Sequence, residues 1–201
     1  MRRLLIVGCG DVGLRMLPLL AGRYRLYALN RSPERRALLR AQGVTPLAGD
    51  LDDAGSLARL AGLPHDVLHF APPPGAGQRD GRTGNLIRAL RKARSIPQRL
   101  VYISTSGVYG DCAGGVVHEH APLHPQTDRA RRRVDAERQL RAWGRASGVS
   151  VVILPGTLVS FLRESRRLDN RRLRRELRLR LRYPSVADGV AAARAARPAG
   201  S

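Results

Sequence analysis

The sequence opens with a short apolar run that ends directly at three closely spaced glycines. Leu4 to Val7 form the run, and Gly8-Cys9-Gly10-Asp11-Val12-Gly13 follows it without a gap. A brief apolar segment, a glycine cluster and then a helical pattern predict a strand, a tight turn and a helix. In such a unit the first glycine permits the turn, and the third lets the helix pack closely on the strand. The chain is therefore expected to begin with the first strand and helix of a parallel sheet.

Alternating strand and helix patterns continue from this unit to about residue 157. Strands are predicted at residues 4–7, 25–29, 45–48, 66–70, 100–104 and 149–154. Helices are predicted near 11–21, 53–60, 84–93 and 128–143, and another between a capping Ser32 and a terminating Gly43. This alternation is typical of an α/β fold, here a Rossmann-like doubly wound parallel sheet with helices on both faces. We expect one Rossmann domain over residues 1–157 and an arginine-rich C-terminal tail over 158–201.

The glycine cluster also predicts a binding site for a dinucleotide. The second glycine leaves room for a pyrophosphate beside the backbone, and the start of the helix supplies N–H donors and partial positive charge. We assign Gly8, Gly10, Asp11, Val12 and Gly13 to this site. The alternative is a glycine-rich turn that binds no ligand. The strand before the cluster and the helix after it favour the site.

The end of the second predicted strand carries Asn30-Arg31-Ser32. NAD sites usually place Asp or Glu there, because a carboxylate accepts a hydrogen bond from the ribose 2′-hydroxyl. A carboxylate would repel the 2′-phosphate of NADP, whereas Arg31 can pair with that phosphate and Ser32 can donate to it. Asn30, Arg31 and Ser32 therefore predict NADP as the cofactor, with NAD as the alternative. On the opposing interpretation, Arg31 is one more surface arginine in a chain with many.

Four further motifs follow the glycine cluster in order. They are Gly49-Asp50-Leu51, Ala71-Pro72-Pro73-Pro74, Ile103-Ser104-Thr105-Ser106-Gly107-Val108-Tyr109-Gly110 and Pro155-Gly156. Each lies at the end of a predicted strand. Together with the glycine cluster they resemble the extended short-chain dehydrogenases, the NAD-dependent epimerase/dehydratase family, over residues 1 to about 157.

The resemblance implies roles for particular residues. The cofactor would be contacted by Asp50 and Leu51 at its adenine, and further by Ala71, Pro72, Ser104 and Pro155. Counting back four positions from Tyr109 places Thr105 at the family's catalytic Ser/Thr, whose hydroxyl bonds the substrate during hydride transfer. Tyr109 is the one phenol near this position. It is the candidate to replace the family's usual proton donor, a tyrosine on the next long helix.

The sequence departs from the family pattern at two places. The family's Tyr-x-x-x-Lys pair falls on Arg129 and Arg133, and a guanidinium cannot act as an acid near neutral pH. Tyr183-Pro184-Ser185 and the segment before it resemble the family's extreme C-terminus, yet they follow Thr157 closely. The resemblance therefore implies an internal deletion that removes the substrate-binding region.

Two functions follow from these observations. One is an NADP(H)-binding oxidoreductase or epimerase-like protein that lacks the Tyr-x-x-x-Lys pair and acts on an unidentified small molecule. The other is a non-catalytic NADP(H)-binding or sensor module. A third, nucleic-acid association through the basic tail, is disfavoured because the tail carries no interleaved aromatic residues.

The composition restricts the other classes of protein. The net charge is +20, but Lys92 is the sole lysine among 36 basic residues, a bias that a GC-rich genome produces without a nucleic-acid partner. The longest apolar runs are too short to cross a bilayer, and the first one stops too soon for a signal peptide, so we expect a cytoplasmic protein. His118, His120 and His124 are expected in a solvated loop, and no metal site is predicted. The charge on the helix after Arg129 argues against transferring the family's dimer, so the oligomeric state is not predicted.

Overall fold

The structure is a computed structural model that describes residues 1–112, 116–118, 121–154 and 167–168. Six strands form one sheet in the order β3-β2-β1-β4-β5-β7, and every neighbouring pair is parallel. The strands are β1 (Arg2–Val7), β2 (Tyr24–Asn30), β3 (Thr45–Ala48), β4 (Asp66–His69), β5 (Arg99–Ile103) and β7 (Ser150–Leu154). This order is that of the doubly wound Rossmann fold. The predicted fold class is confirmed.

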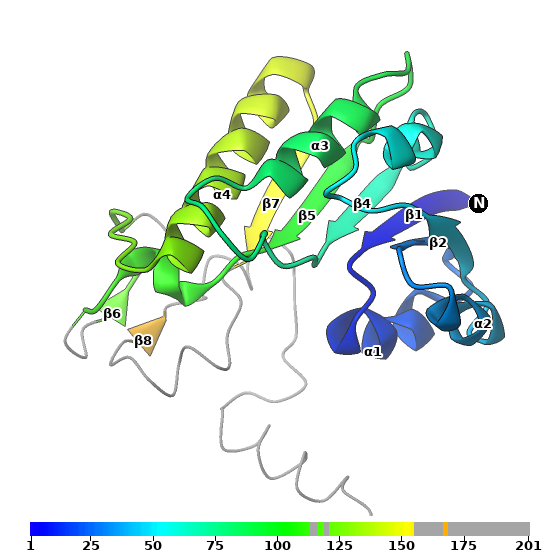
Figure 1. Ribbon diagram of the computed structural model, residues 1–201, viewed down its shortest axis with the longest axis horizontal. Helices are drawn as coiled ribbons and strands as arrows, with labels where there is room; N and C mark the ends of the chain where they lie inside the picture. The colour runs from blue at the N-terminus through cyan, green and yellow to red at the C-terminus, as the bar shows by residue number, and fades with distance from the viewer. Residues whose placement is uncertain (113–115, 119–120, 155–166, 169–201) are drawn as a thin grey trace, which may run out of the picture.

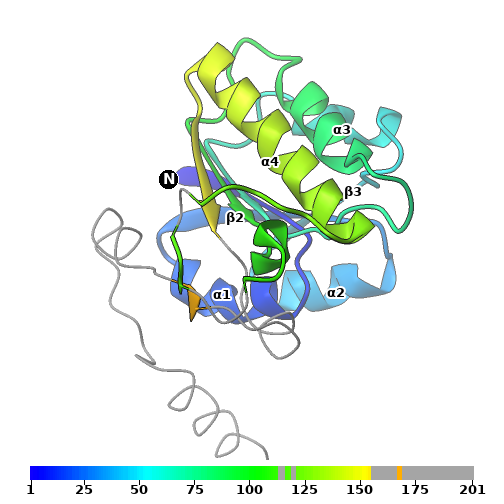
Figure 2. The same cartoon turned by 90° about the vertical axis from the view of Figure 1, so that its left-hand side faces the viewer.

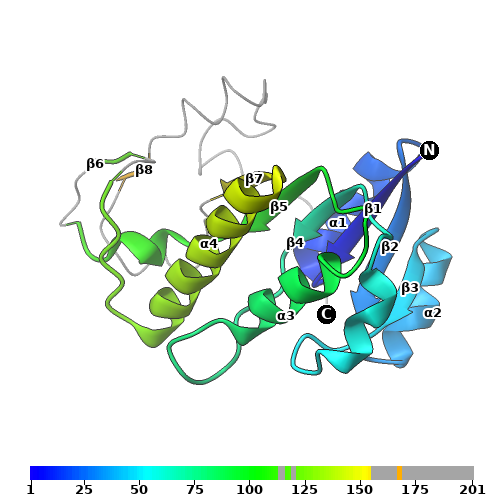
Figure 3. The ribbon, with the colours of Figure 1, turned by 90° about the horizontal axis from the view of Figure 1, so that it is seen from above.

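Helices cover both faces of this sheet. The helical elements are α1 (Asp11–Leu20), α2 (Glu34–Ala41), the 3₁₀ turn η1 (Gly55–Leu60), α3 (Gly81–Leu90), the 3₁₀ turn η2 (Ser106–Tyr109) and α4 (Asp128–Ser147). Helices α1 and α2 lie on one face, and α3 and α4 lie side by side on the other (Figures 1 and 2). Figure 3 shows the second pair from above. The first helices of the chain thus cover one face and the later ones cover the other, as in a doubly wound fold.

Side chains that point alternately to the two faces of β1 divide the core into two layers. Leu4 and Ile6 are buried against the α1 and α2 side, and Leu5 and Val7 are buried in the cluster that includes α3 and α4. Successive side chains of a strand point to opposite faces, so a strand covered on both sides is apolar throughout. The residues from Leu4 to Val7 are all apolar because both faces of β1 are covered by helices.

Several element bounds differ from the predictions. The helix predicted at 84–93 begins earlier, at Gly81, because the carboxylate of Asp80 accepts a hydrogen bond from the backbone N–H of Thr83 and caps it. The helix predicted to end at 143 continues to Ser147. The capping role predicted for Ser32 is wrong, since no side chain caps α2 and the Ser32 hydroxyl donates to Glu34 instead.

A second, two-stranded sheet lies apart from the main one. It pairs β6 (Val116–Val117) with β8 (Arg167–Leu168) in parallel, and neither strand was predicted. Strands of two residues carry too little periodicity to be recognised in sequence. The boundary predicted near residue 157 and nearly all of the predicted tail lie outside the described residues. Within the described part, no helix is long and apolar enough to cross a membrane.

Candidate functional site

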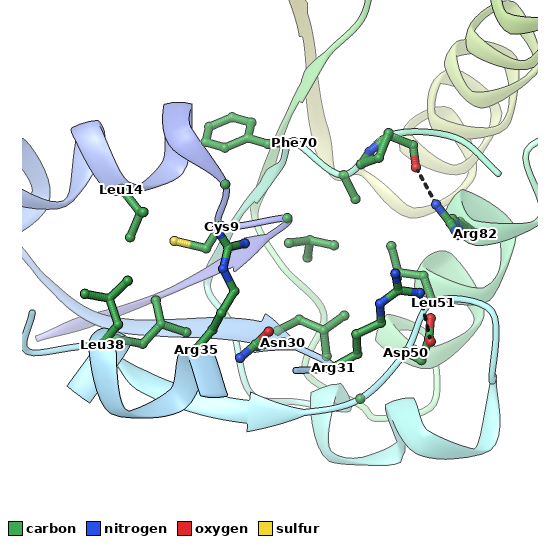
Figure 4. Close-up of a pocket in the computed structure, with 18 residues that line it drawn as sticks. Cys9, Leu14, Asn30, Arg31, Arg35, Leu38, Asp50, Leu51, Phe70 and Arg82 are labelled. Atoms are coloured by element: carbon green, nitrogen blue, oxygen red, sulfur yellow. Dashed lines mark hydrogen bonds and ion pairs between the residues drawn. The ribbon is translucent and has the colours of Figure 1, made fainter. Parts of the chain in front are cut away.

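A pocket of about 340 Å³ opens at the carboxyl ends of β1 to β4. In an open α/β sheet this edge is where ligands bind. The pocket is lined by Val7, Gly8, Cys9, Gly10, Leu14, Leu29, Asn30, Arg31, Arg35, Leu38, Leu39, Gly49, Asp50, Leu51, Phe70, Ala71, Pro72 and Arg82. Eight of the predicted site residues are therefore brought together there: Gly8, Gly10, Asn30, Arg31, Asp50, Leu51, Ala71 and Pro72. Figure 4 shows their arrangement.

The glycine turn leaves an open floor beside the start of α1. Gly8 has φ +86°, and a Cβ there would lie 2.4 Å from the backbone nitrogen of Ala71. Gly10 precedes α1 directly, and a Cβ on it would have no heavy atom within 4 Å. The first position therefore demands glycine for the fold, and the second leaves space for a ligand.

The remaining three residues predicted from the glycine cluster do not line the pocket. Asp11 pairs with Arg15 at the surface, and Val12 is half exposed. A Cβ on the buried Gly13 would lie 3.2 Å from the sulfur of Cys9, so this glycine permits close packing of α1 on the turn. That is the role expected of the third glycine. Because these three side chains do not line the pocket, α1 would contact a ligand mainly through the backbone at its N-terminus.

The end of β2 forms a turn in which all three predicted side chains already have partners. The Asn30 side chain closes this turn, because its Nδ2 atom donates to the Ser32 carbonyl and its Oδ1 atom accepts from the Ser32 N–H. The Ser32 hydroxyl donates to Glu34, and that bond lowers the pKa of Glu34. Arg31 lies 3.6 Å from the carboxylate of Asp50 across the pocket, and its side chain is 71% exposed.

Arg35 is a pocket residue that sequence reasoning missed. It lies in the first turn of α2 and extends toward Cys9 and the glycine turn (Figure 4). Burial raises the pKa of the Cys9 thiol, and the nearby charge of Arg35 partly opposes that rise. Arg31 precedes α2, so helical spacing does not connect it with Arg35, and no local pattern indicated this residue.

The opposite wall comes from the turns after β3 and β4. Asp50, Leu51, Ala71 and Pro72 line it, as predicted, and Arg82 joins them from α3. No local sequence pattern predicts that Arg82 lines the pocket, because the residues that it contacts are distant in sequence. Arg82 and Arg31 each pair with a carboxylate, of Asp52 and Asp50. Arg35 therefore leaves the site with a net positive charge, which favours an anion.

The predicted catalytic residues lie away from this pocket. Thr105 caps η2, its hydroxyl accepting from the N–H of Gly107 at 3.3 Å, and Tyr109 is the last residue of η2. The buried Ser104 donates to Glu137 at 2.5 Å. Pro155 lies outside the described residues. Ser104 and Thr105 follow β5 directly, two strands away from β1 in the sheet.

Arg133, at the position where the resemblance implied the family's lysine, is a buried residue of α4 that faces β5. Its Nη1 atom donates to the hydroxyl of Tyr102 and to the carbonyl of Ile103, both at 2.8 Å. The ring of His69 stacks obliquely on Tyr102, and its Nε2 atom lies 3.0 Å from the hydroxyl of Thr83. Burial, and then the charge of Arg133, lower the pKa of His69 to about 3.

The strand order, the glycine turn and the pocket above it define a Rossmann-like α/β domain of the nucleotide-binding class. The sequence model of the NAD dependent epimerase/dehydratase family matches residues 4–160. The chain belongs to this family, as the resemblance predicted.

Known proteins resemble this chain over its first three quarters. A GDP-6-deoxy-D-mannose reductase of Pseudomonas aeruginosa is 32% identical over 156 residues, which cover 76% of this chain and 50% of the reductase. A dTDP-glucose 4,6-dehydratase of Streptomyces venezuelae, solved with NAD bound, is 29% identical with a TM-score of 0.62, covering 75% of this chain and 54% of its own. The chain thus spans about half the length of these relatives, in agreement with the predicted deletion.

A second solved structure matches nearly the whole chain. A protein of unknown function from Silicibacter pomeroyi is 21% identical, with a TM-score of 0.64. The match covers 98% of this chain and 100% of that one. At this identity the likeness shows the fold alone. It does show that the fold occurs in another chain of similar length.

Proposed function

We propose that the pocket binds NADP(H), and that this binding is the function of the described part of the chain. The observation that carries the proposal is the open space at Gly10 beside the start of α1, with Arg31 and Arg35 across the pocket. The bound group would supply hydride chemistry. The chain's own contribution is a backbone surface and positive charge that hold phosphates. A cytoplasmic location belongs to the same proposal, whereas an unidentified small-molecule substrate belongs to the second candidate function, the oxidoreductase.

The residues present fit a dinucleotide at each of its charged parts. A pyrophosphate requires close approach to backbone N–H groups, and Gly10 leaves that approach free. The α1 N-terminus adds partial positive charge there. An adenosine would lie between the turns that carry Leu51 and Ala71, which the resemblance associates with the cofactor.

The charges at the end of β2 support NADP over NAD. Ser32 and Asn30 have local partners, so Arg31 and Arg35 are the groups that would meet a 2′-phosphate. Asp50 opposes this preference, because its carboxylate competes for Arg31 and could itself accept from a ribose hydroxyl. Arg35 forms no ion pair with another described residue, so we assign it the larger share of the preference.

Titration of the purified chain with NADPH and NADH tests the proposal. NADPH should bind more tightly, and Arg35→Ala and Arg31→Ala should each weaken NADPH by roughly 1.5–3 kcal/mol, the value of a hydrogen bond between charged groups. NADH affinity should change little. Arg40→Ala, an exposed arginine on the same helix outside the pocket, is the matched control. Equal affinities for the two cofactors would refute the NADP preference, and no binding of either would refute the site.

An oxidoreductase is the second candidate function. It is favoured by the 32% identity to a reductase and by the position of Thr105 directly after β5. The hydroxyl of Thr105 is the one group that matches the family's catalytic set. The half-length match and the burial of Arg133 weigh against turnover.

A further inference from the structure

Arg82, in the first turn of α3, joins two loops of the pocket. Its Nε and Nη2 atoms lie 2.8 and 2.6 Å from the two carboxylate oxygens of Asp52, which follows β3. Its Nη1 atom donates to the carbonyls of Pro72 and Pro73, which follow β4, at 3.2 and 3.3 Å. One guanidinium therefore contacts both loops at once, and Figure 4 shows it at the pocket wall.

These two loops carry the adenosine-side lining of the pocket. Leu51 directly precedes Asp52, Ala71 directly precedes Pro72, and both Leu51 and Ala71 line the pocket. A second side chain of α3 acts on the same loop, because Asn85 donates from Nδ2 to the Leu51 carbonyl at 2.7 Å. The first turns of α3 thus hold the two loops of this wall relative to each other.

The contacts of Arg82 are directed at the protein rather than at the open pocket. Its side chain is 20% exposed, and four of its N–H···O contacts go to the two loops. The bond to Arg82 lowers the pKa of Asp52, and the same bond raises the pKa of Arg82, so both groups are charged at neutral pH. Asp52 itself does not line the pocket.

We propose that Arg82 is a positioning residue, which holds the loops after β3 and β4 in the geometry that accepts the adenosine half of a dinucleotide. The inference rests on the proposed function. Loops that are already ordered lose less freedom on binding, so the ligand binds more tightly. Arg82 acts on the ligand through the loops, with Asp52 as its anchor.

The test compares Arg82→Ala, Asp52→Ala and the double variant, each titrated with NADPH and with 2′,5′-ADP. Each single change should weaken both ligands by about tenfold, and the double variant should be no weaker than the singles, because all three break one clamp. Arg82→Lys should recover part of the affinity, since an ammonium group can reach Asp52 but not all of the partners. Arg91→Ala, an exposed arginine at the end of the same helix, should bind as the wild type does.

Hydrogen exchange in the ligand-free protein gives a second readout. Amides 50–53 and 75–77 should exchange faster in both Arg82→Ala and Asp52→Ala, while the core strands and the thermal transition stay within the wild-type range. If Asp52→Ala keeps full affinity while Arg82→Ala loses it, or if the two losses multiply, Arg82 contacts the ligand directly and the positioning role is wrong. If the wild type binds neither ligand, the proposed function fails. If hydrogen exchange of the loop amides is unchanged in both variants, Arg82 does not hold the loops, whether or not the wild type binds a ligand.

Discussion

Gly8 and Gly10 belong to one turn, but a side chain would meet different surroundings at each. Gly8 has φ +86° and lies against the backbone of Ala71, whereas Gly10 faces open space. Gly10→Val should therefore abolish NADPH binding and leave the thermal transition nearly unchanged, because the new side chain fills the pyrophosphate position. Gly8→Ala should lower the melting temperature, since it adds both backbone strain and a contact of 2.4 Å.

Calorimetric titration and a thermal melt of each variant separate the two effects. Wild-type affinity in Gly10→Val would show that the turn does not bind the pyrophosphate. A wild-type melt in Gly8→Ala would contradict the geometry of the turn. The two variants serve as controls for each other, since both alter the same turn at positions two residues apart.

At the scale of elements, a buried polar layer joins β4 and β5 to α3 and α4. It contains His69 and Thr83, with Tyr102, Arg133 and Asp80 around them. Burial lowers the pKa of His69 to about 3, while Asp80, also buried, has a raised pKa. A layer of this kind stabilises the fold only when its polar atoms have partners.

The depressed pKa of His69 makes the folded state sensitive to acid. Between pH 6.5, the ordinary pKa of the ring, and pH 3, the unfolded chain binds a proton at His69 and the folded chain does not. The free energy of unfolding should therefore fall as the pH falls through this window, with about 1.4 kcal/mol per pH unit arising from this group. Above pH 6.5 its contribution is constant.

Denaturant unfolding at pH 7 and pH 5 measures this dependence. His69→Gln should show a smaller loss of stability between the two pH values than the wild type, because it cannot take up the proton. His124→Gln, at an exposed position, should keep the wild-type dependence and serves as the control. The same loss in His69→Gln as in the wild type would contradict the assignment to His69.

At the scale of the whole molecule, the chain should show little or no dehydrogenase or epimerase turnover. Its family match ends at residue 160, and it spans about half of its relatives. The resemblance implies that only the hydroxyl of Thr105 would match the family's catalytic set. Positioned acid–base groups contribute roughly 10² to 10⁴ in rate, and unpositioned reactants cost several kcal/mol more.

Consumption of NADPH across a panel of aldehydes, ketones and nucleotide sugars checks this prediction. Arg129→Tyr with Arg133→Lys should not restore turnover, because the side chain at position 133 is directed to Tyr102 and Ile103, inside the protein. Turnover that disappears in Thr105→Ala but persists in Tyr109→Phe would disprove the prediction and identify Thr105 as catalytic.

The sequence by itself determined the fold and the floor of the site. An apolar run buried on both faces, a glycine turn and repeated strand–helix alternation act through neighbouring residues, so their meaning can be read locally. Gly8 permits the turn and Gly13 permits close packing of α1, as the motif predicts, although Gly13 does not line the pocket. Gly10 leaves the open space in which we propose the pyrophosphate to bind. Arg31 was found for the same reason, at the end of a predictable strand.

Tertiary structure alone decided which charges act together. Arg31 meets Asp50 and Arg82 meets Asp52 because parallel strands end at one edge, which places residues 19 to 30 positions apart in contact. Ser104 was assigned to the ligand from its position in a motif, but its hydroxyl bonds Glu137, 33 residues away in sequence. A hydroxyl or guanidinium takes whichever partner the folded chain brings within about 3 Å, and no local pattern records that choice.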